Sequence, residues 1–197
     1  DIYDRFVEEA VAKFNSVKVG LPWEADTMMG SQIYEAHLNK ILDYIEIGKK
    51  EGARVACGGE RITDGELAKG CFLKPTLLVD VTNDMRVAQE EIFGPVACLL
   101  PFKDEAEGLR LANDVEYGLA SYIWTQDVSK VLRLARNIEA GMVFVNTQNV
   151  RDLRQPFGGV KASGTGREGG EYSFEVFAEM KNVCISMGDH PIPKWGI

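Results

Sequence analysis

Histidine is scarce in this 197-residue chain, which carries only His37 and His190. The four cysteines lie far apart and form no CxxC pair. We therefore expect no structural zinc site, because such sites need closely spaced His and Cys ligands. The same shortage argues against a Ser-His-Asp or Cys-His catalytic set, and no P-loop motif is present. Scattered cysteines with apolar neighbours are typical of reduced thiols, which predicts a cytoplasmic protein.

Long hydrophobic runs and excess positive charge are also lacking. No stretch approaches the roughly 18 apolar residues that span a bilayer, and no signal peptide opens the chain. The 22 Lys and Arg residues face 30 Asp and Glu residues, which gives a net charge of −8. That charge repels phosphate backbones, so we expect no nucleic-acid partner and no membrane partner. The length of 197 residues favours one large domain, or one domain with an appendage, and a hydrophobic content of 45% argues against disorder.

The hydrophobic pattern alternates between helical and strand-like segments. It predicts helices over 2–14, 31–49, 104–113, 127–138 and 173–177, with Asp104 and Asp127 as N-terminal caps. It predicts strands over 54–57, 72–81, 96–102, 119–125, 142–146 and 182–186. Such alternation is typical of an α/β fold with a mostly parallel sheet and flanking helices. The chain begins inside a helical pattern without a cap, which suggests a piece of something longer.

A glycine-rich loop contains Gly164-Thr-Gly166-Arg-Glu-Gly169, which matches GxGxxG. As a dinucleotide fingerprint this motif needs a strand directly before it and a strand–helix–strand unit around it. The nearest expected strand ends near Asn146, so we reject the fingerprint. A loop in which glycines allow backbones to approach closely is the favoured interpretation.

Positive charge collects between residues 151 and 167, where three arginines and Lys161 face a single acid, Asp152. Arginine forks match carboxylates, so the pair Arg151 and Arg154 predicts a site for an anionic ligand. The alternative is that each arginine pairs with a surface acid. We favour that alternative for Arg167, which has Glu168 beside it.

Two weaker signals lie earlier in the chain. Glu90 and Glu91 precede Phe93 in EEIFGPV, just before an expected strand, and by themselves they indicate a turn with a hydrophobic contact. His37 and Lys40 are three residues apart and face away from the apolar stripe of their helix, which by itself indicates a solvated face.

Four segments together resemble the aldehyde dehydrogenase superfamily, in its order and spacing. They are EEIFGPV, NDVEYGLA, GMVFVN and PFGGVKASGTGRE, at residues 90–96, 113–120, 141–146 and 156–168. The stretch TQNVRDLRQPFGG and the ending GDHPIPKWG resemble a subgroup that oxidises a carboxylated semialdehyde in aromatic-acid breakdown. The resemblance covers only the C-terminal part of the family's catalytic domain. It implies residues 1–177 as that part and 178–197 as an oligomerisation strand and tail.

The resemblance implies NAD as cofactor, with NADP possible. Glu91 and Phe93 match residues that contact the nicotinamide ribose and ring. Lys40 and His37 match helix positions that reach the same ribose, and His37 stands where glutamine is common.

For the substrate, the resemblance implies that Phe157 forms an aromatic wall of the tunnel. Arg151 stands where members that oxidise apolar aldehydes have an aromatic residue, which suits a carboxylated aldehyde, and Arg154 is expected to assist it. Simpler aldehydes and 2-hydroxymuconic semialdehyde are the alternative substrates.

The family's nucleophilic cysteine, general-base glutamate and dinucleotide domain all precede the matched part, so none of the four cysteines takes the catalytic role. We expect this chain alone to be inactive. The strand over 182–186 is expected to join a neighbouring subunit, with Trp195 in a tail against that partner. A non-catalytic oligomerisation module is the other hypothesis.

Overall fold

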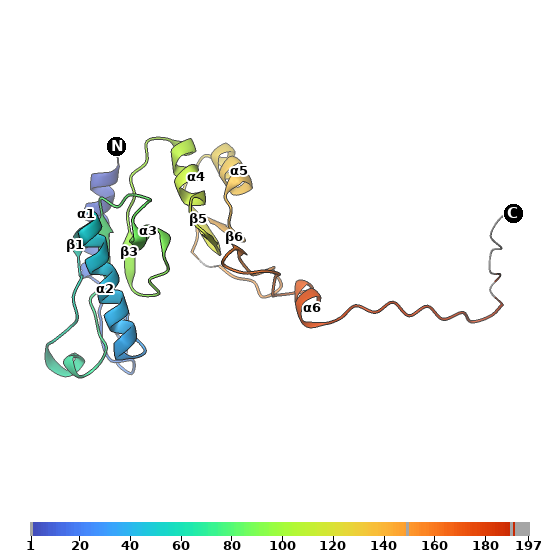
Figure 1. Ribbon diagram of the computed structural model, residues 1–197, viewed down its shortest axis with the longest axis horizontal. Helices are drawn as coiled ribbons and strands as arrows, with labels where there is room; N and C mark the ends of the chain where they lie inside the picture. Colours follow the sequence, from blue (N-terminus) through green and yellow to red (C-terminus); the bar gives the residue numbers. More distant parts are fainter. Residues whose placement is uncertain (1, 149, 190, 192–197) are drawn as a thin grey trace. The chain divides into compact units, whose positions relative to one another are not determined.

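The computed structural model describes residues 2–148, 150–189 and 191, and the chain forms two compact units, residues 1–115 and 116–197 (Figure 1). Each unit has its own strands and helices. The predicted division into 1–177 and 178–197 stays a prediction, because it distinguishes a segment by its contact with another subunit.

The first unit is a three-stranded sheet with helices packed against it. Its strands are β1 (Arg54–Cys57), β2 (Thr76–Val79) and β3 (Val96–Cys98). They lie in the order β1-β2-β3, with β1 antiparallel and β3 parallel to β2. The helices are α1 (Tyr3–Asn15), α2 (Glu35–Glu51), the 3-10 helix η1 (Gly65–Lys69), α3 (Arg86–Gln89) and α4 (Glu105–Asn113).

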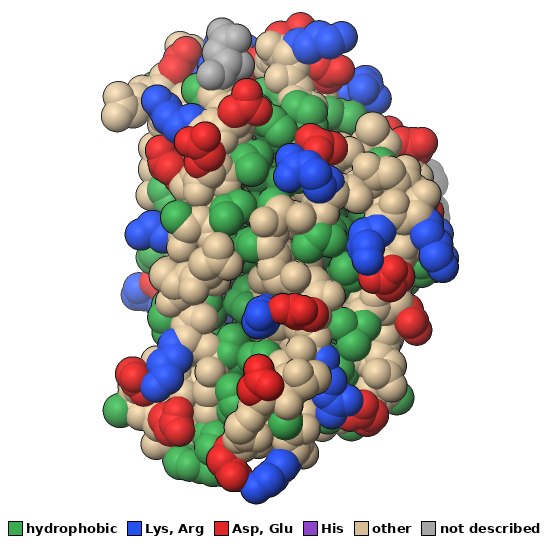
Figure 2. Space-filling view, turned by 90° about the vertical axis from the view of Figure 1, so that its left-hand side faces the viewer, with side chains coloured by type: hydrophobic (Ala, Val, Ile, Leu, Met, Phe, Trp, Pro, Cys, Tyr) green, Lys and Arg blue, Asp and Glu red, His purple; other side chains and the backbone are tan. Residues whose placement is uncertain are grey.

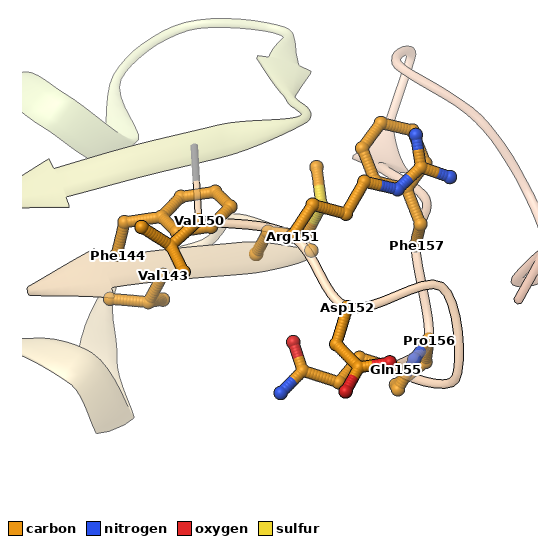
Figure 3. Close-up of a pocket in the computed structure, with 10 residues that line it drawn as sticks. Val143, Phe144, Val150, Arg151, Asp152, Gln155, Pro156 and Phe157 are labelled. Carbon is orange, nitrogen blue, oxygen red and sulfur yellow. The ribbon is translucent and has the colours of Figure 1, made fainter. Parts of the chain in front are cut away.

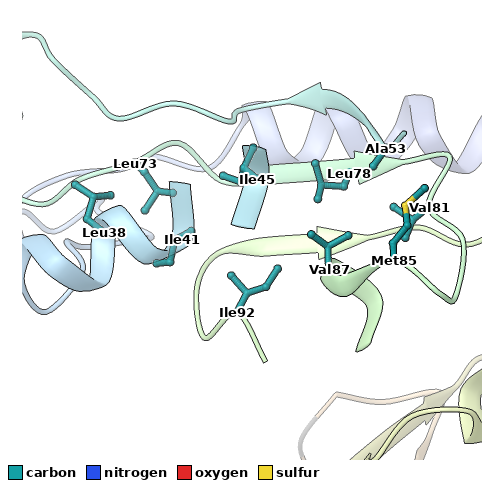
Figure 4. Close-up of a cluster of buried hydrophobic side chains, with 10 residues drawn as sticks. All are labelled: Leu38, Ile41, Ile45, Ala53, Leu73, Leu78, Val81, Met85, Val87 and Ile92. Atoms are coloured by element: carbon teal, nitrogen blue, oxygen red, sulfur yellow. The ribbon is translucent and has the colours of Figure 1, made fainter. Parts of the chain in front are cut away.

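The core of this unit lies between α2 and the sheet. Leu38, Ile41 and Ile45 recur at helical spacing and are at most 1% exposed, so α2 buries one continuous stripe. Figure 4 shows them beside Leu73 and Leu78. The remaining members of the cluster are Ala53, Val81, Met85, Val87 and Ile92. Because this stripe of α2 is buried against the sheet, the opposite face of the helix points away from the core.

The second unit contains one strand–helix–strand repeat. β5 (Ala120–Ile123) pairs in parallel with β6 (Met142–Val145), and α5 (Val128–Asn137) connects them. β4 (Tyr117–Gly118) pairs antiparallel with β7 (Val160–Lys161), and α6 (Tyr172–Phe177) follows the glycine loop.

Both predicted helix caps are confirmed. The Asp127 carboxylate accepts a hydrogen bond from the Lys130 backbone N–H at 3.1 Å, and Asp104 accepts one from Glu107 N–H at 2.9 Å. Asp127 thus satisfies an otherwise unpaired donor in the first turn of α5.

Glycine allows the start of β6 to touch the glycine loop. A Cβ at Gly141 would overlap the carbonyl oxygen of Gly158. Within the loop, Phe157 and Glu168 form an isolated antiparallel bridge, and their two backbone hydrogen bonds have N to O distances of 2.7 and 2.8 Å. The strand before the GxGxxG string, β7, has only two residues and pairs antiparallel. In the described chain the loop therefore lies outside any strand–helix–strand unit. This agrees with the interpretation that its glycines allow close backbone approach.

The predicted α/β class is confirmed, and the helices and strands are generally shorter than predicted. The helix predicted over 31–49 begins only at Glu35, and the strand predicted over 72–81 covers only Thr76–Val79. Residues 178–189 contain no helix or strand and are drawn as an extended trace in Figure 1. A strand exists only beside a hydrogen-bonding neighbour, so the pairing predicted for 182–186 with a second subunit stays a prediction. Trp195 lies outside the described residues.

Charge is evenly mixed on the face drawn in Figure 2, where Lys and Arg side chains alternate with Asp and Glu and hydrophobic side chains show between them. None of the helices in the described residues has the length and apolar character that crossing a membrane requires.

Candidate functional site

The turn between α3 and β3 presents two side chains to solvent. Ile92 is 6% exposed and anchors the turn in the core, whereas its neighbours Glu91 and Phe93 point outward. Phe93 is 71% exposed and has a φ of 55°, in the left-handed region that non-glycine residues rarely adopt. A bulky residue held there without burial costs free energy, and such residues cluster at functional sites.

The outer face of α2 holds this turn by its carbonyl groups. His37 Nε2 lies 2.7 Å from the Phe93 carbonyl oxygen, and Lys40 Nζ donates to the Glu91 carbonyl oxygen at 3.2 Å. The rings of His37 and Phe93 are 6.0 Å apart. Because a carbonyl only accepts, His37 carries a proton on Nε2, while its buried Nδ1 has no partner in the described residues. All four residues predicted to bind the cofactor therefore meet at one place.

The two adjacent glutamates of the turn have different surroundings. Glu90 accepts two hydrogen bonds of 2.8 Å from Arg86 and one of 2.7 Å from the Tyr44 hydroxyl. Arg86 first and Tyr44 second lower the pKa of Glu90 to about 2. In the part of the chain that the structure describes, the Glu91 carboxylate has no hydrogen bond or ion pair, so it is available to a ligand.

Sequence analysis missed this supporting network of Arg86, Glu90 and Tyr44. The i,i+4 spacing of Arg86 and Glu90 was a usable signal. The Tyr44 contact joins residues 46 positions apart and had none.

The second unit contains a cavity of about 340 Å³ beside β6 (Figure 3). Met142, Val143 and Phe144 form its strand side, and the loop from Val150 to Phe157 forms the other. Arg151 and Asp152 are the charged residues of its lining. The lining thus mixes apolar side chains with one cationic and one anionic group.

Arg151 and Phe157 lie together in the wall of this cavity. The guanidinium carbon of Arg151 is 3.9 Å from the centre of the Phe157 ring, and one Nη is 2.9 Å from Glu168 Oε1. Figure 3 shows the arginine side chain extended toward the ring. Stacking on an aromatic face holds the guanidinium plane while leaving its edges open.

The other two arginines between residues 151 and 167 make contacts outside the cavity. Arg154 pairs with Asp152, is 88% exposed and does not line the cavity. The structure therefore does not place it beside Arg151, because the short-range pair with Asp152 turns it outward. Arg167 donates to the carbonyl oxygens of Gly159 and Gly166, both at 2.7 Å, which gives it a structural role in the glycine loop.

Three cysteines have surroundings that disfavour a thiolate. Burial raises the pKa of the Cys98 thiol to about 11, and burial also raises the pKa of Cys57. For Cys71, burial is the larger cause of the raised pKa and the neighbouring Glu35 carboxylate adds to it. A thiol with a raised pKa is a poor nucleophile at neutral pH. Among the described residues, no group of three His, Cys, Asp or Glu side chains could hold a metal ion.

The family of the chain follows from comparison with known proteins. The profile of the aldehyde dehydrogenase family matches residues 1–183. The chain belongs to this family. It is 65% identical over 175 residues to the 5-carboxymethyl-2-hydroxymuconate semialdehyde dehydrogenase of Escherichia coli, a match that covers 87% of this chain and 37% of that protein.

Solved structures agree with the fold. HpcC from Thermus thermophilus superposes with a TM-score of 0.91 at 45% identity, over 99% of this chain and 38% of that one. Betaine aldehyde dehydrogenase from Staphylococcus aureus, solved in complex with NAD+, superposes with a TM-score of 0.87 at 38% identity, over 89% of this chain and 35% of that one. The chain thus spans less than two fifths of the length of these relatives.

Proposed function

We propose that this chain supplies part of the active site of an NAD-dependent aldehyde dehydrogenase that oxidises a carboxylated semialdehyde to the acid. The observation that carries the substrate class is Arg151, stacked on Phe157 in the wall of the cavity beside β6. The name of the E. coli relative, 65% identical, supports 5-carboxymethyl-2-hydroxymuconate semialdehyde as the substrate.

The turn at Glu91 and Phe93 fits the nicotinamide end of the cofactor. The Glu91 carboxylate, which has no partner among the described residues, accepts hydrogen bonds from ribose hydroxyl groups, and the exposed Phe93 ring offers a flat surface that limits movement of the nicotinamide. His37 and Lys40 hold the turn through its carbonyl groups, and the Lys40 ammonium has further donors for the ribose. The NAD+ complex of the S. aureus relative supports NAD as the cofactor. NAD, when bound, supplies the oxidant for the aldehyde.

Arg151 is the residue that selects for a carboxylated substrate. Its guanidinium offers donors in a fixed plane, which match the two oxygens of a carboxylate, and the apolar side chains of β6 in the cavity receive the carbon chain. Arg154 does not bind the substrate carboxylate in this proposal, because its side chain faces solvent.

The test of the substrate class is Arg151→Leu in the full-length enzyme. A charge-assisted hydrogen bond contributes about 1.5–3 kcal/mol, and partial exposure lowers that, so we expect the KM of a carboxylated aldehyde to rise about tenfold. The KM of a neutral aldehyde of equal length should stay within twofold. Arg154→Leu is the matched control and should leave both values unchanged. An unchanged KM for the carboxylated aldehyde in Arg151→Leu would refute the assignment.

The 197-residue chain alone should not turn over aldehyde. Three of its cysteines have raised pKa values, and the family's nucleophile precedes the matched part. Incubation of the purified chain with NAD and an aldehyde should give no NADH. Rapid NADH formation would show that a cysteine of this chain acts as the nucleophile.

Residues 182–186 should pair with a second copy of the chain. Val183 and Ile185 alternate along this segment, Met187 follows it at the same spacing, and the three are 68%, 73% and 95% exposed, as expected for a strand whose apolar face is covered by a partner. Val183→Glu with Ile185→Glu should lower the mass of the full-length enzyme in solution, measured by light scattering. An unchanged mass would contradict the pairing.

A further inference from the structure

Arg151 is already engaged by one residue outside the cavity lining, Glu168. Phe157 and Glu168 are directly opposite each other in the antiparallel bridge, with both backbone hydrogen bonds formed. Side chains of directly opposed residues project to the same side. Arg151 lies across both, stacked on the ring and bonded to the carboxylate.

The contact with Glu168 uses only part of the arginine. One Nη donates to Glu168 Oε1 at 2.9 Å, and in the described residues Nε and the other Nη make no hydrogen bond. Since the Phe157 ring covers one face of the guanidinium, an anionic ligand approaches at the free edge, in the guanidinium plane. A carboxylate there lies close to Glu168 and is repelled by it.

We propose that Glu168 is a specificity-determining residue that weakens the binding of anionic substrate ends at Arg151. This inference rests on the proposed function. Glu168 orients the arginine and at the same time offsets its charge, so the site accepts a carboxylate without holding the acid product too tightly. A product with a second carboxylate would otherwise leave slowly from an arginine with no neighbouring acid.

The size of the effect follows from distance and exposure. Two carboxylates on adjacent edges of one guanidinium are about 5 Å apart, and with the dielectric of water, which suits this exposed pair, their repulsion corresponds to about a fivefold change in affinity. The side chains of Arg151 and Glu168 are 37% and 54% exposed, so their pair contributes little to folding. Substitution of Glu168 should therefore change selectivity and leave the protein folded.

The experiment compares Glu168→Gln with wild type in the full-length enzyme. Glutamine keeps the shape and the hydrogen bond to Arg151 but removes the charge. The measured quantity is the ratio of kcat/KM for succinic semialdehyde to that for butanal, which have equal carbon chains. A common effect on the chemical step cancels in this ratio. We expect the ratio to rise about fivefold and the inhibition constant of succinate to fall by the same factor.

Three further variants complete the design. Glu171→Gln removes an exposed charge near α6 that has no ion pair in the described structure, and it should leave the ratio unchanged. Glu168→Asp keeps the charge, so its ratio should stay within twofold of wild type. In an Arg151→Leu background, Glu168→Gln should have no effect on the ratio, because the arginine that links the two carboxylates is gone.

The outcomes separate this inference from the proposed function. If Arg151→Leu lowers the ratio but Glu168→Gln leaves it unchanged or lowers it, the role of Glu168 is refuted and the substrate class stands. If Arg151→Leu leaves the ratio unchanged, both are refuted. An equal rise in Glu171→Gln would show that net surface charge, not Glu168, controls selectivity.

Discussion

Replacing Ile41 with alanine tests how the core supports the candidate cofactor turn. Ile41 is 0% exposed on α2, four residues beyond His37. Its side chain lies directly against Gly94, because a Cβ on that glycine would be 2.5 Å from Ile41 Cδ1. Gly94 follows Phe93 in the turn, so the Ile41 side chain packs against the turn from the core.

The expected loss of stability follows from burial. Truncation removes every side-chain carbon beyond Cβ, which forfeits about 2–3 kcal/mol at about 0.8 kcal/mol per buried carbon. The cavity left behind adds to this, so the free energy of unfolding should fall by about 3–4 kcal/mol. With a urea slope of about 2 kcal/mol per molar, the midpoint should fall by about 1.5–2 M.

Ile45→Ala is the matched control, since Ile45 is 1% exposed and lies one turn further along α2, near Gly59. Both variants should lose similar stability in urea titrations. In the full-length enzyme at low temperature, Ile41→Ala should weaken NAD binding, measured by fluorescence titration, more than Ile45→Ala does. Equal affinities would refute the link between Ile41 and the turn, and a stability loss under about 1 kcal/mol would refute the packing.

Three other substitutions test particular contacts. Gly141→Ala should lower the thermal midpoint markedly, because its Cβ would overlap the Gly158 carbonyl oxygen and cost about 1–3 kcal/mol, whereas Gly188→Ala, in open space, should not. The pKa of Glu90 is about 2 in the folded chain against 4.5 normally, so its contribution is present above pH 4.5 and is lost as the pH falls toward 2. Wild type should therefore lose more stability than Glu90→Gln across that window in acid titrations followed by circular dichroism; parallel curves would contradict this. Asp127→Ala should cost about 1 kcal/mol in urea unfolding through loss of the α5 cap, and Asp127→Asn should restore most of it.

Local chemistry explains which predictions from the sequence succeeded. The periodicity of Leu38, Ile41 and Ile45 predicts the buried face of α2, because side chains four residues apart share a face in any helix. Asp104 and Asp127 predict helix starts, because the cap acts within three residues. The strand ends were less predictable, since they depend on where a neighbouring strand stops pairing.

For the candidate sites, too, local features were predictable from the sequence and long-range contacts were not. The sequence determined the fold class, the cap positions and, through the family's motifs, the residues that meet at the Glu91 turn. Only the tertiary structure decided that Tyr44 also engages Glu90 while Glu91 stays unpaired among the described residues, because the Tyr44 contact depends on how α2 packs against the turn. It also separated the two arginines that the sequence treated alike. Arg154 finds Asp152 two residues away, whereas Arg151 reaches Glu168 only because the glycine loop folds back beside Phe157.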